Sequence, residues 1–184
     1  ARQNMSRLPD MNELYRGDGG YGMRVPEEAN GYQTAHARWL LDSYRQLTGR
    51  DLLAPELPAL AVAREMYYAP FAVLSHDDAE DPCFTYANLT AQILFSMPWR
   101  DIVGLPSRHS AEPMLREERQ RLLEMVSRQG YIDDYRGVRI GRDGRRFEIR
   151  QATVWNLPDS QGQVVGQAAM FADWVPLWPG ELGI

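Results

Sequence analysis

The chain has 184 residues, 44% of them hydrophobic and 24% charged, which is typical of one soluble globular domain with an extension. Its formal net charge of −5 argues against general nucleic-acid binding, which depends on neutralising phosphates. The single cysteine, Cys83, excludes an internal disulfide and any zinc site built from several cysteines. No apolar run approaches the roughly 18 residues of a membrane helix, so we expect a cytoplasmic protein without membrane contact.

Residues 1–33 are expected to form an N-terminal arm. This stretch shows little periodicity and contains many glycines and prolines, which interrupt regular structure. Its scattered apolar residues favour an arm laid on this subunit or a neighbour over a solvated tail. The glycines between Gly17 and Gly22 have the wrong spacing for a phosphate-binding loop.

Residues 34–68 are expected to form two lead-in helices. The first has one apolar stripe at helical spacing, with Asn30 or Thr34 as candidate cap and Gly49 at its end; the stripe comprises His36, Trp39, Leu40, Ser43, Tyr44 and Leu47. No second histidine lies nearby in the sequence, so His36 is predicted to be packed and hydrogen-bonded. The second helix covers about 59–68 and stops before Pro70. Whether these helices cover a sheet or contact a second subunit stays open.

Three strand-like runs follow one another between Tyr131 and Trp174. Asp143-Gly144 is a strong hairpin signal, and the stretch from Asp159 to Gly162 offers a looser version of the same turn chemistry. Hydrophobic and polar residues alternate in the middle run, so two sets should point to opposite faces: Phe147, Ile149, Gln151, Thr153 and Trp155 on one, and Arg146, Glu148, Arg150, Ala152 and Val154 on the other. The first set is mostly large and apolar, which places it toward a core.

Two polar residues interrupt that apolar face. Gln151 and Thr153 stand in its middle, and buried polar side chains need partners. This pattern favours a ligand pocket in front of the sheet. The alternative is a filled core in which Gln151 and Thr153 bond to the backbone.

From Phe71 onward, the predicted elements follow a recognisable order. Two short strands, PFAVLSH and CFTYAN, flank an acidic turn, and Asn88 or Thr90 can cap a short helix that Pro98 closes. A longer helix is predicted from about Ala111 to Gln129, with Ser110 as its cap. The three-stranded meander comes last, and this order of elements resembles that of PAS domains.

Several phrases together resemble the MEKHLA domain, a PAS-like family. They are AHARWLLDSYRQLTGRDLL, LPSRHSAEP, REER, GYIDDYRGVRI, GRRFEI, ATVWNL and GQAAMF, in this order. The resemblance covers about residues 34–174 and is closer to the stand-alone bacterial members than to the plant ones. It implies an α+β fold with a PAS-like antiparallel sheet of about five strands and helices on one face. The expected parts are the arm (1–33), lead-in helices (34–68), PAS-like core (69–175) and C-terminal tail (176–184).

The sequence disfavours haem, flavin and a metal as cofactors. Haem-binding PAS domains use a histidine on the long helix, which here contains none, and His109 lies in the turn before it. Flavin photoreceptors of the PAS class carry a cysteine after the second strand, whereas Cys83 begins that strand. The acidic turn holds the densest set of ligand-type residues, but its spacing fits no calcium loop and favours a solvated loop; the set comprises His76, Asp77, Asp78, Glu80, Asp81 and Cys83.

No catalytic motif stands out, so an enzyme is disfavoured without being excluded. The expected function is a sensory domain that binds an unknown small molecule between sheet and helices and signals through a homodimer or partner protein. A ligand-free dimerisation or interaction module is the alternative. The predicted pocket residues are Phe84, Tyr86, Phe95, Trp99, Leu122, Val126, Gln151, Thr153, Trp155 and Gln167.

Overall fold

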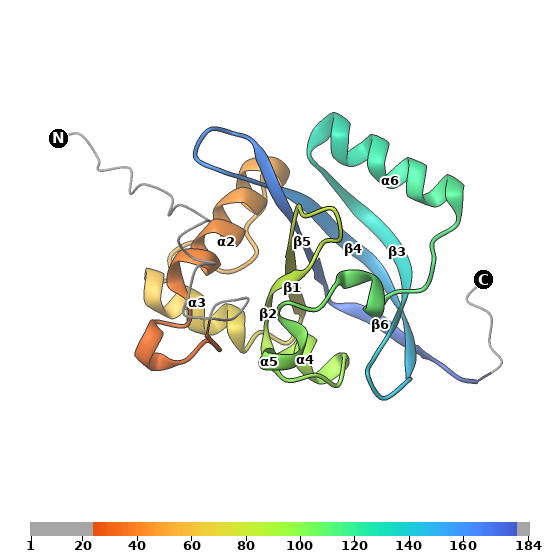
Figure 1. Ribbon diagram of the computed structural model, residues 1–184. Coiled ribbons are helices and arrows are strands. Elements are labelled where there is room, and N and C mark those ends of the chain that lie inside the picture. Colours follow the sequence, from red (N-terminus) through yellow and green to blue (C-terminus); the bar gives the residue numbers. More distant parts are fainter. Residues whose placement is uncertain (1–23, 180–184) are drawn as a thin grey trace.

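An antiparallel sheet forms the centre of the molecule (Figure 1). The structure is a computed structural model, and it describes residues 24–179. The strands follow the order β2-β1-β5-β4-β3, and β6 pairs with β4 beside β5. Their bounds are β1 Ala72–Asp77, β2 Phe84–Ala87, β3 Tyr131–Ile140, β4 Arg146–Pro158, β5 Val164–Phe171 and β6 Asp173–Leu177. The predicted PAS-like antiparallel sheet is therefore confirmed, with β6 as a strand that the sequence did not indicate.

Five α-helices and two 3-10 turns accompany the sheet in the described residues. They are η1 Glu28–Asn30, α2 Thr34–Thr48, α3 Ala59–Tyr67, α4 Leu89–Leu94, α5 Trp99–Ile102, η2 Ser107–Ser110 and α6 Arg116–Gln129. Gly49 ends α2 in the left-handed region, as predicted, and the side chain of Asn88 caps α4 by accepting from Ala91 N. The start of α2 differs from the prediction, because Asn30 is the last residue of η1, where its Oδ1 accepts from Glu27 N at 3.0 Å, and Thr34 is already helical, with Gln33 as the residue before the helix. No helix among residues 24–179 is long and apolar enough to cross a membrane.

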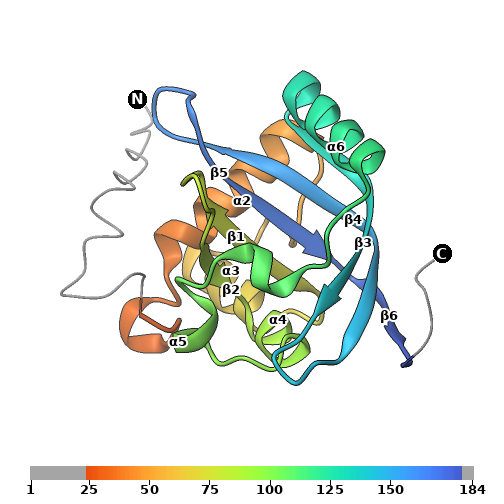
Figure 2. The ribbon, with the colours of Figure 1, turned by 45° about the vertical axis from the view of Figure 1, so that its right-hand side comes forward.

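Helices α2 and α6 pack on opposite faces of the sheet. Trp155 and Asn156 are consecutive on β4, and consecutive strand residues point to opposite faces. The Trp155 indole bonds to Ser43 of α2, whereas the Asn156 amide bonds to the Val126 carbonyl of α6. Figure 1 accordingly shows the sheet between α2 and α6, and in Figure 2 α6 lies along β3 and β4. We call the α6 side the inner face and the α2 side the outer face.

The alternation of β4 reverses at Gln151. Asn156 points to the inner face, and so does Phe147, whose ring packs against Phe95 at the end of α4, 5.2 Å between centroids. Between them Gln151 has φ +47° and an exposed side chain, and the register with β3 shifts there. The prediction that Gln151 points inward was wrong, and so was the placement of Thr153 and Trp155 on the same face as Phe147. A bulge inserts one residue and flips everything beyond it.

The long helix begins five residues later than predicted. Residues 111–115 run beside the edge strand β3, where Ala111 forms a bridge with Arg139 and Glu112 N donates to Val138 O at 3.4 Å. Ser110, the predicted cap, belongs to η2 and donates its hydroxyl to Ser107 O. The bridge at Ala111 and the hydrogen bond from Glu112 hold this stretch extended beside β3, and α6 starts only at Arg116.

The two ends of the chain are described in part. Within the predicted arm, residues 1–23 lie outside the described residues. Residues 24–33 contain η1, and the two ends of this segment are joined by a hydrogen bond in which the Gln33 side-chain amide donates to Arg24 O at 2.8 Å. Within the predicted tail, β6 extends to Leu177 and residues 180–184 lie outside the described part.

Candidate ligand-binding site

A row of polar side chains crosses the middle of the inner face. His76 of β1 lies opposite Gln167 of β5, which lies opposite Asn156 of β4. Gln167 Nε2 donates to Asn156 Oδ1 at 3.2 Å, and Asn156 Nδ2 donates to Val126 O of α6 at 3.2 Å. The row thus joins three strands to the last turns of the helix above them. The sequence prediction included Gln167 but missed His76 and Asn156.

His76 is a neutral group at this site. Its Nδ1 lies 2.7 Å from the carbonyl oxygen of Asp77, which can only accept, so Nδ1 carries the proton and Nε2 is an acceptor. Burial lowers the pKa of His76, the hydrogen bond to Asp77 raises it in part, and the positive charge of Arg139 lowers it further. The ring therefore contributes an acceptor and no charge at neutral pH.

Arg139 brings a positive charge to the inner face from β3. It lies opposite Phe147, and its guanidinium lies 5.7 Å from the ring centre of Tyr135 and donates to the Tyr135 hydroxyl at 3.3 Å. Tyr135 is buried and Arg139 half-buried. Among residues 24–179, no carboxylate forms an ion pair with Arg139. A half-buried cation without a counter-ion is unusual, because charges taken out of water are normally paired.

A cavity of about 220 Å³ opens beside Arg139. It lies between residues 112–115, Glu118 at the start of α6, residues 135–139 of β3 and Glu148 of β4. Of the 14 residues of α6, all of which are described, only Val126 is buried. Leu122 and Met125 of the same helix are partly buried against the core. The helix that covers this part of the sheet is therefore lightly attached.

Two of the acidic residues around this cavity are already neutralised. Glu112 Oε1 lies 2.5 Å from Arg146 Nε, and this hydrogen bond raises the pKa of Arg146. Glu148 is bound by Arg136 at 2.9 Å and by Arg150 at 2.8 Å. Burial raises the pKa of Glu148, but the hydrogen bonds and charges of the two arginines outweigh it and leave that pKa lowered. Both carboxylates are therefore paired with arginines.

The ten predicted pocket residues separate into several groups. Phe95, Val126 and Gln167 belong to the inner face, Leu122 lies half-buried on α6, and Phe84 lies opposite His76. Tyr86, Thr153 and Trp155 belong to the outer face and therefore lie on the opposite side of the sheet from the polar row. Gln151 is exposed, as described above, and Trp99 lines a different cavity.

A buried polar cluster on the outer face holds α2 to the sheet. His36 is 1% exposed; its ring stacks on Tyr86 and its Nε2 lies 3.0 Å from Ser75 Oγ, which in turn lies 2.8 Å from Thr85 Oγ1. Burial lowers the pKa of His36 to about 3 and raises that of Tyr86. The prediction of a packed, hydrogen-bonded histidine is confirmed. Among the described atoms, His36 Nδ1 and the Tyr86 hydroxyl have no hydrogen-bond partner.

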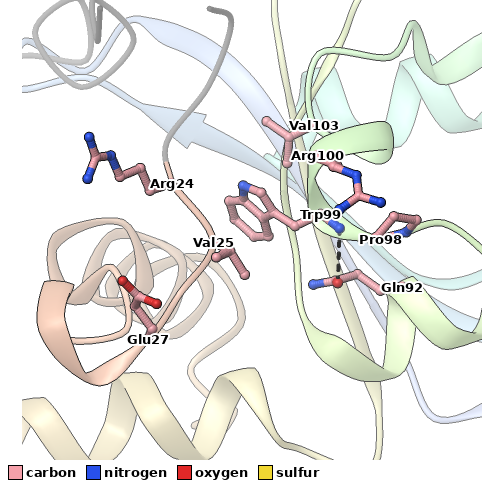
Figure 3. Close-up of a pocket in the computed structure, with 8 residues that line it drawn as sticks. All are labelled: Arg24, Val25, Glu27, Gln92, Pro98, Trp99, Arg100 and Val103. Carbon is pink, nitrogen blue, oxygen red and sulfur yellow. Dashed lines mark hydrogen bonds between the residues drawn. The ribbon is translucent and has the colours of Figure 1, made fainter.

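Trp99 lines a larger cavity of about 550 Å³ between the start of the described chain and the α4–α5 region (Figure 3). Gln92 Oε1 accepts from Trp99 N at 3.1 Å and fixes this corner. The other lining residues are Arg24, Val25, Glu27, Pro98, Arg100 and Val103. This cavity is separate from the polar row of the inner face.

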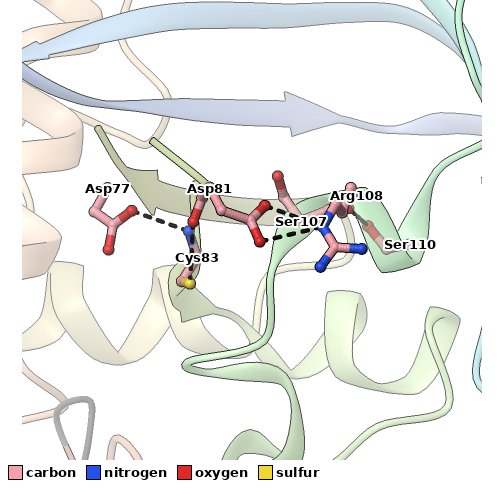
Figure 4. Close-up of polar contacts among 6 residues, drawn as sticks. All are labelled: Asp77, Asp81, Cys83, Ser107, Arg108 and Ser110. Atoms are coloured by element: carbon pink, nitrogen blue, oxygen red, sulfur yellow. Dashed lines mark hydrogen bonds and ion pairs between the residues drawn. The ribbon is translucent and has the colours of Figure 1, made fainter. Parts of the chain in front are cut away.

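The acidic turn is held by protein contacts (Figure 4). Asp77 Oδ1 accepts from Cys83 N at 2.9 Å, and Arg108 Nε contacts both carboxylate oxygens of Asp81 at 3.1 Å. Cys83 Sγ contacts Asp81 O at 3.4 Å; burial, Asp77 and Asp81 raise the pKa of its thiol. In the part of the chain that the structure describes, no three His, Cys, Asp or Glu side chains gather as a metal site. His109 is exposed.

Two solved structures illustrate which known folds this chain resembles. The PAS domain of a protein from Colwellia psychrerythraea is 16% identical, with 62% of this chain and 92% of that chain covered and a TM-score of 0.51. An RNA-binding light-oxygen-voltage receptor is 18% identical, with 68% of this chain but only 35% of that chain covered and a TM-score of 0.53. These likenesses show a shared fold.

Comparison at the level of sequence identifies the family. None of the functionally curated proteins matches this chain. The sequence model of the MEKHLA domain matches residues 34–176, which span α2, every later helix and the sheet up to Pro176 in β6. The chain therefore belongs to the MEKHLA domain family, and its fold is that of a PAS domain.

Proposed function

We propose that this protein is a sensory domain that binds a small molecule on the inner face, beneath α6. The observation that supports this most is the polar row of His76, Gln167 and Asn156, placed where a solid core would carry apolar side chains. Binding pockets combine apolar walls with a few fixed polar groups. Leu122, Met125 and Val154 supply partly buried apolar walls.

The proposed signal follows from how α6 is attached. Asn156 binds the last turns of α6 through its amide, and that amide is held by Gln167. A ligand that competes for either group changes how α6 is anchored to the sheet. Most of the surface of α6 is already exposed. We propose that a homodimer or a partner protein reads this change, since a ligand shifts a conformation only through different contacts in the two states.

We further propose that the ligand is bound without a covalent bond to protein and without haem. Cys83 lies in the acidic turn with its thiol on Asp81 O, and His109 is exposed in η2. Among residues 24–179, no recorded hydrogen bond joins either side chain to the polar row. A flavin or another organic molecule held by hydrogen bonds alone is compatible with this arrangement.

Native mass spectrometry of the purified full chain tests the proposal. We expect a co-purified small-molecule mass that Gln167→Ala abolishes and that Gln151→Ala leaves in place. The two glutamines make a matched pair, because one belongs to the polar row and the other is exposed on the neighbouring strand. A ligand-free dimer in all three proteins would instead favour an interaction module without a ligand. If Gln167→Ala retained the bound mass, the ligand would have to bind at a site other than the polar row.

A further inference from the structure

We infer that the ligand carries a carboxylate group and that Arg139 binds it in the cavity beside residues 112–115. This inference rests on the proposed function, since it names the chemical class of the bound small molecule. The cavity lies at the β3 edge and is lined by none of the polar-row residues; Arg139, opposite Phe147, is its link to the inner face. It starts from the charge of Arg139, which no carboxylate of residues 24–179 balances. A guanidinium presents donors in a planar fork that matches a carboxylate with two parallel hydrogen bonds.

Tyr135 supplies a second donor at the same place. Its hydroxyl oxygen accepts from Arg139 Nη2, which leaves the hydroxyl proton to be donated outward. The ring is 5% exposed and lies across Gly137, because a Cβ at Gly137 would stand 2.6 Å from the Tyr135 hydroxyl oxygen. The hydroxyl is thus held in position before a ligand arrives, which lowers the entropy cost of binding.

The charges of the other residues around the cavity leave the single positive charge of Arg139 to be balanced by one anion. Glu112 and Glu148 are neutralised by their own arginines, so they do not compete for Arg139. Glu118 is exposed at the first turns of α6 and opposes the ligand weakly through solvent. A single unpaired cation suits one carboxylate better than a phosphate ester, whose charge of nearly −2 calls for several donors.

The size and walls of the cavity restrict the rest of the ligand. Its volume of about 220 Å³ equals roughly seven water molecules at about 30 Å³ each. Pro113, Met114 and Val138 give it an apolar lining next to Arg139. The ligand is therefore a small acid with a short aliphatic chain or one ring.

The test uses matched pairs of carboxylic acids and primary amides with two to eight carbons, titrated into the purified full chain by calorimetry. We expect at least one acid to bind. Its amide should bind more weakly than the acid by a factor of about ten or more. Arg139→Gln should weaken the acid about tenfold or more and leave the amide unchanged. Glu118→Gln should strengthen the acid a few-fold, since it removes a nearby negative charge.

Arg142→Gln is the matched control, because Arg142 is exposed and paired with Asp101 on the β3–β4 turn. Tyr135→Phe keeps the ring and removes the hydroxyl, which separates loss of a donor from loss of the fold. Equal binding of acid and amide, or equal losses in Arg139→Gln and Arg142→Gln, would overturn the inference while the inner-face site stands. If no probe binds, a co-purified mass that is lost in Arg139→Gln supports the inference, and one that is retained overturns it. Absence of any ligand in both experiments would defeat the proposed function itself.

Discussion

The indole of Trp155 donates to the hydroxyl of Ser43 at 3.0 Å, joining the middle of β4 to α2 across 112 residues of chain. The Ser43 hydroxyl in turn donates to Trp39 O at 2.7 Å, so both of its hydrogen-bonding roles are in use. Trp155 is completely buried, and its ring meets Tyr44 edge-on. This contact fixes α2 on the outer face.

Replacing Ser43 with alanine should lower the free energy of unfolding by about 1–3 kcal/mol, because it leaves the buried indole N–H of Trp155 without a hydrogen-bond acceptor. Urea denaturation followed by tryptophan fluorescence measures the change. Trp155→Phe removes the donor, and in that background Ser43→Ala should cost clearly less than in the wild type. Strict additivity of the two changes would show that the bond contributes nothing.

Acid should destabilise the protein through His36. Its pKa is lowered to about 3 in the folded state, against 6.5 for the free side chain. Between these values the unfolded chain binds a proton that the folded chain does not, so the free energy of unfolding falls as pH falls. The slope that His36 adds is at most about 1.4 kcal/mol per pH unit.

Urea titrations between pH 7 and 4 measure that slope, and His36→Gln should make it shallower. His76 and Glu148, whose pKa values are also lowered, add slopes of the same sign in both proteins. The comparison with His36→Gln therefore isolates one group. Identical slopes would mean that His36 takes up its proton in the folded state.

Gln151 should tolerate glycine far better than valine. Its φ of +47° is a strained conformation for a branched side chain, and its exposed side chain loses no packing when replaced. We expect Gln151→Val to cost about 1–3 kcal/mol and Gln151→Gly to be neutral or stabilising by up to about 1 kcal/mol. Thermal unfolding measures both. If Gln151→Val stabilised the protein, that result would contradict the bulge and favour the uninterrupted strand that the sequence pattern predicted.

Gly166→Ala should weaken the pairing of β1 with β5 beneath the polar row. A Cβ at this position would stand 2.4 Å from the carbonyl oxygen of His76, which is backbone and cannot swing aside. We expect a loss of about 1–3 kcal/mol in chemical denaturation. Val164→Ala, an exposed change at the start of β5, is the control and should stay within about 0.5 kcal/mol.

Cys83→Ser should leave any ligand in place. The thiol lies in the acidic turn, and its pKa is raised, so it is a poor nucleophile at neutral pH. Native mass spectrometry should show the same bound mass in the variant as in the wild type. Loss of that mass in the serine variant alone would indicate a covalent bond.

The elements that local chemistry dictates were predictable from the sequence. The Asp143-Gly144 turn and the alternation beside it gave the β3–β4 hairpin, and Gly49 gave the end of α2. What local patterns do not contain is tertiary pairing. The bridge between Ala111 and Arg139 of β3 keeps the start of this segment extended, so α6 is shorter than the sequence from Ala111 onward indicated.

The site was predicted in part for a related reason. Gln167 was among the residues predicted to line the inner face, but Asn156 was not, because the alternation was followed unbroken through Gln151. Nothing in the residue type of Gln151 signals a left-handed conformation, which glycine or asparagine would have suggested. His76 was considered only as part of the acidic turn, although its place at the end of an apolar strand could have indicated the inner face.

The bulge at Gln151 also makes the length of β4 a determinant of which residues meet the ligand. Deleting that one residue would give a continuous alternation, and either Phe147 and Ile149 or Thr153, Trp155 and Asn156 would have to exchange faces. Point substitutions at the same position leave both halves of the strand in phase with their partners. In related sequences, a gap or insertion at this position therefore signals a rebuilt binding face more strongly than any change of residue type does.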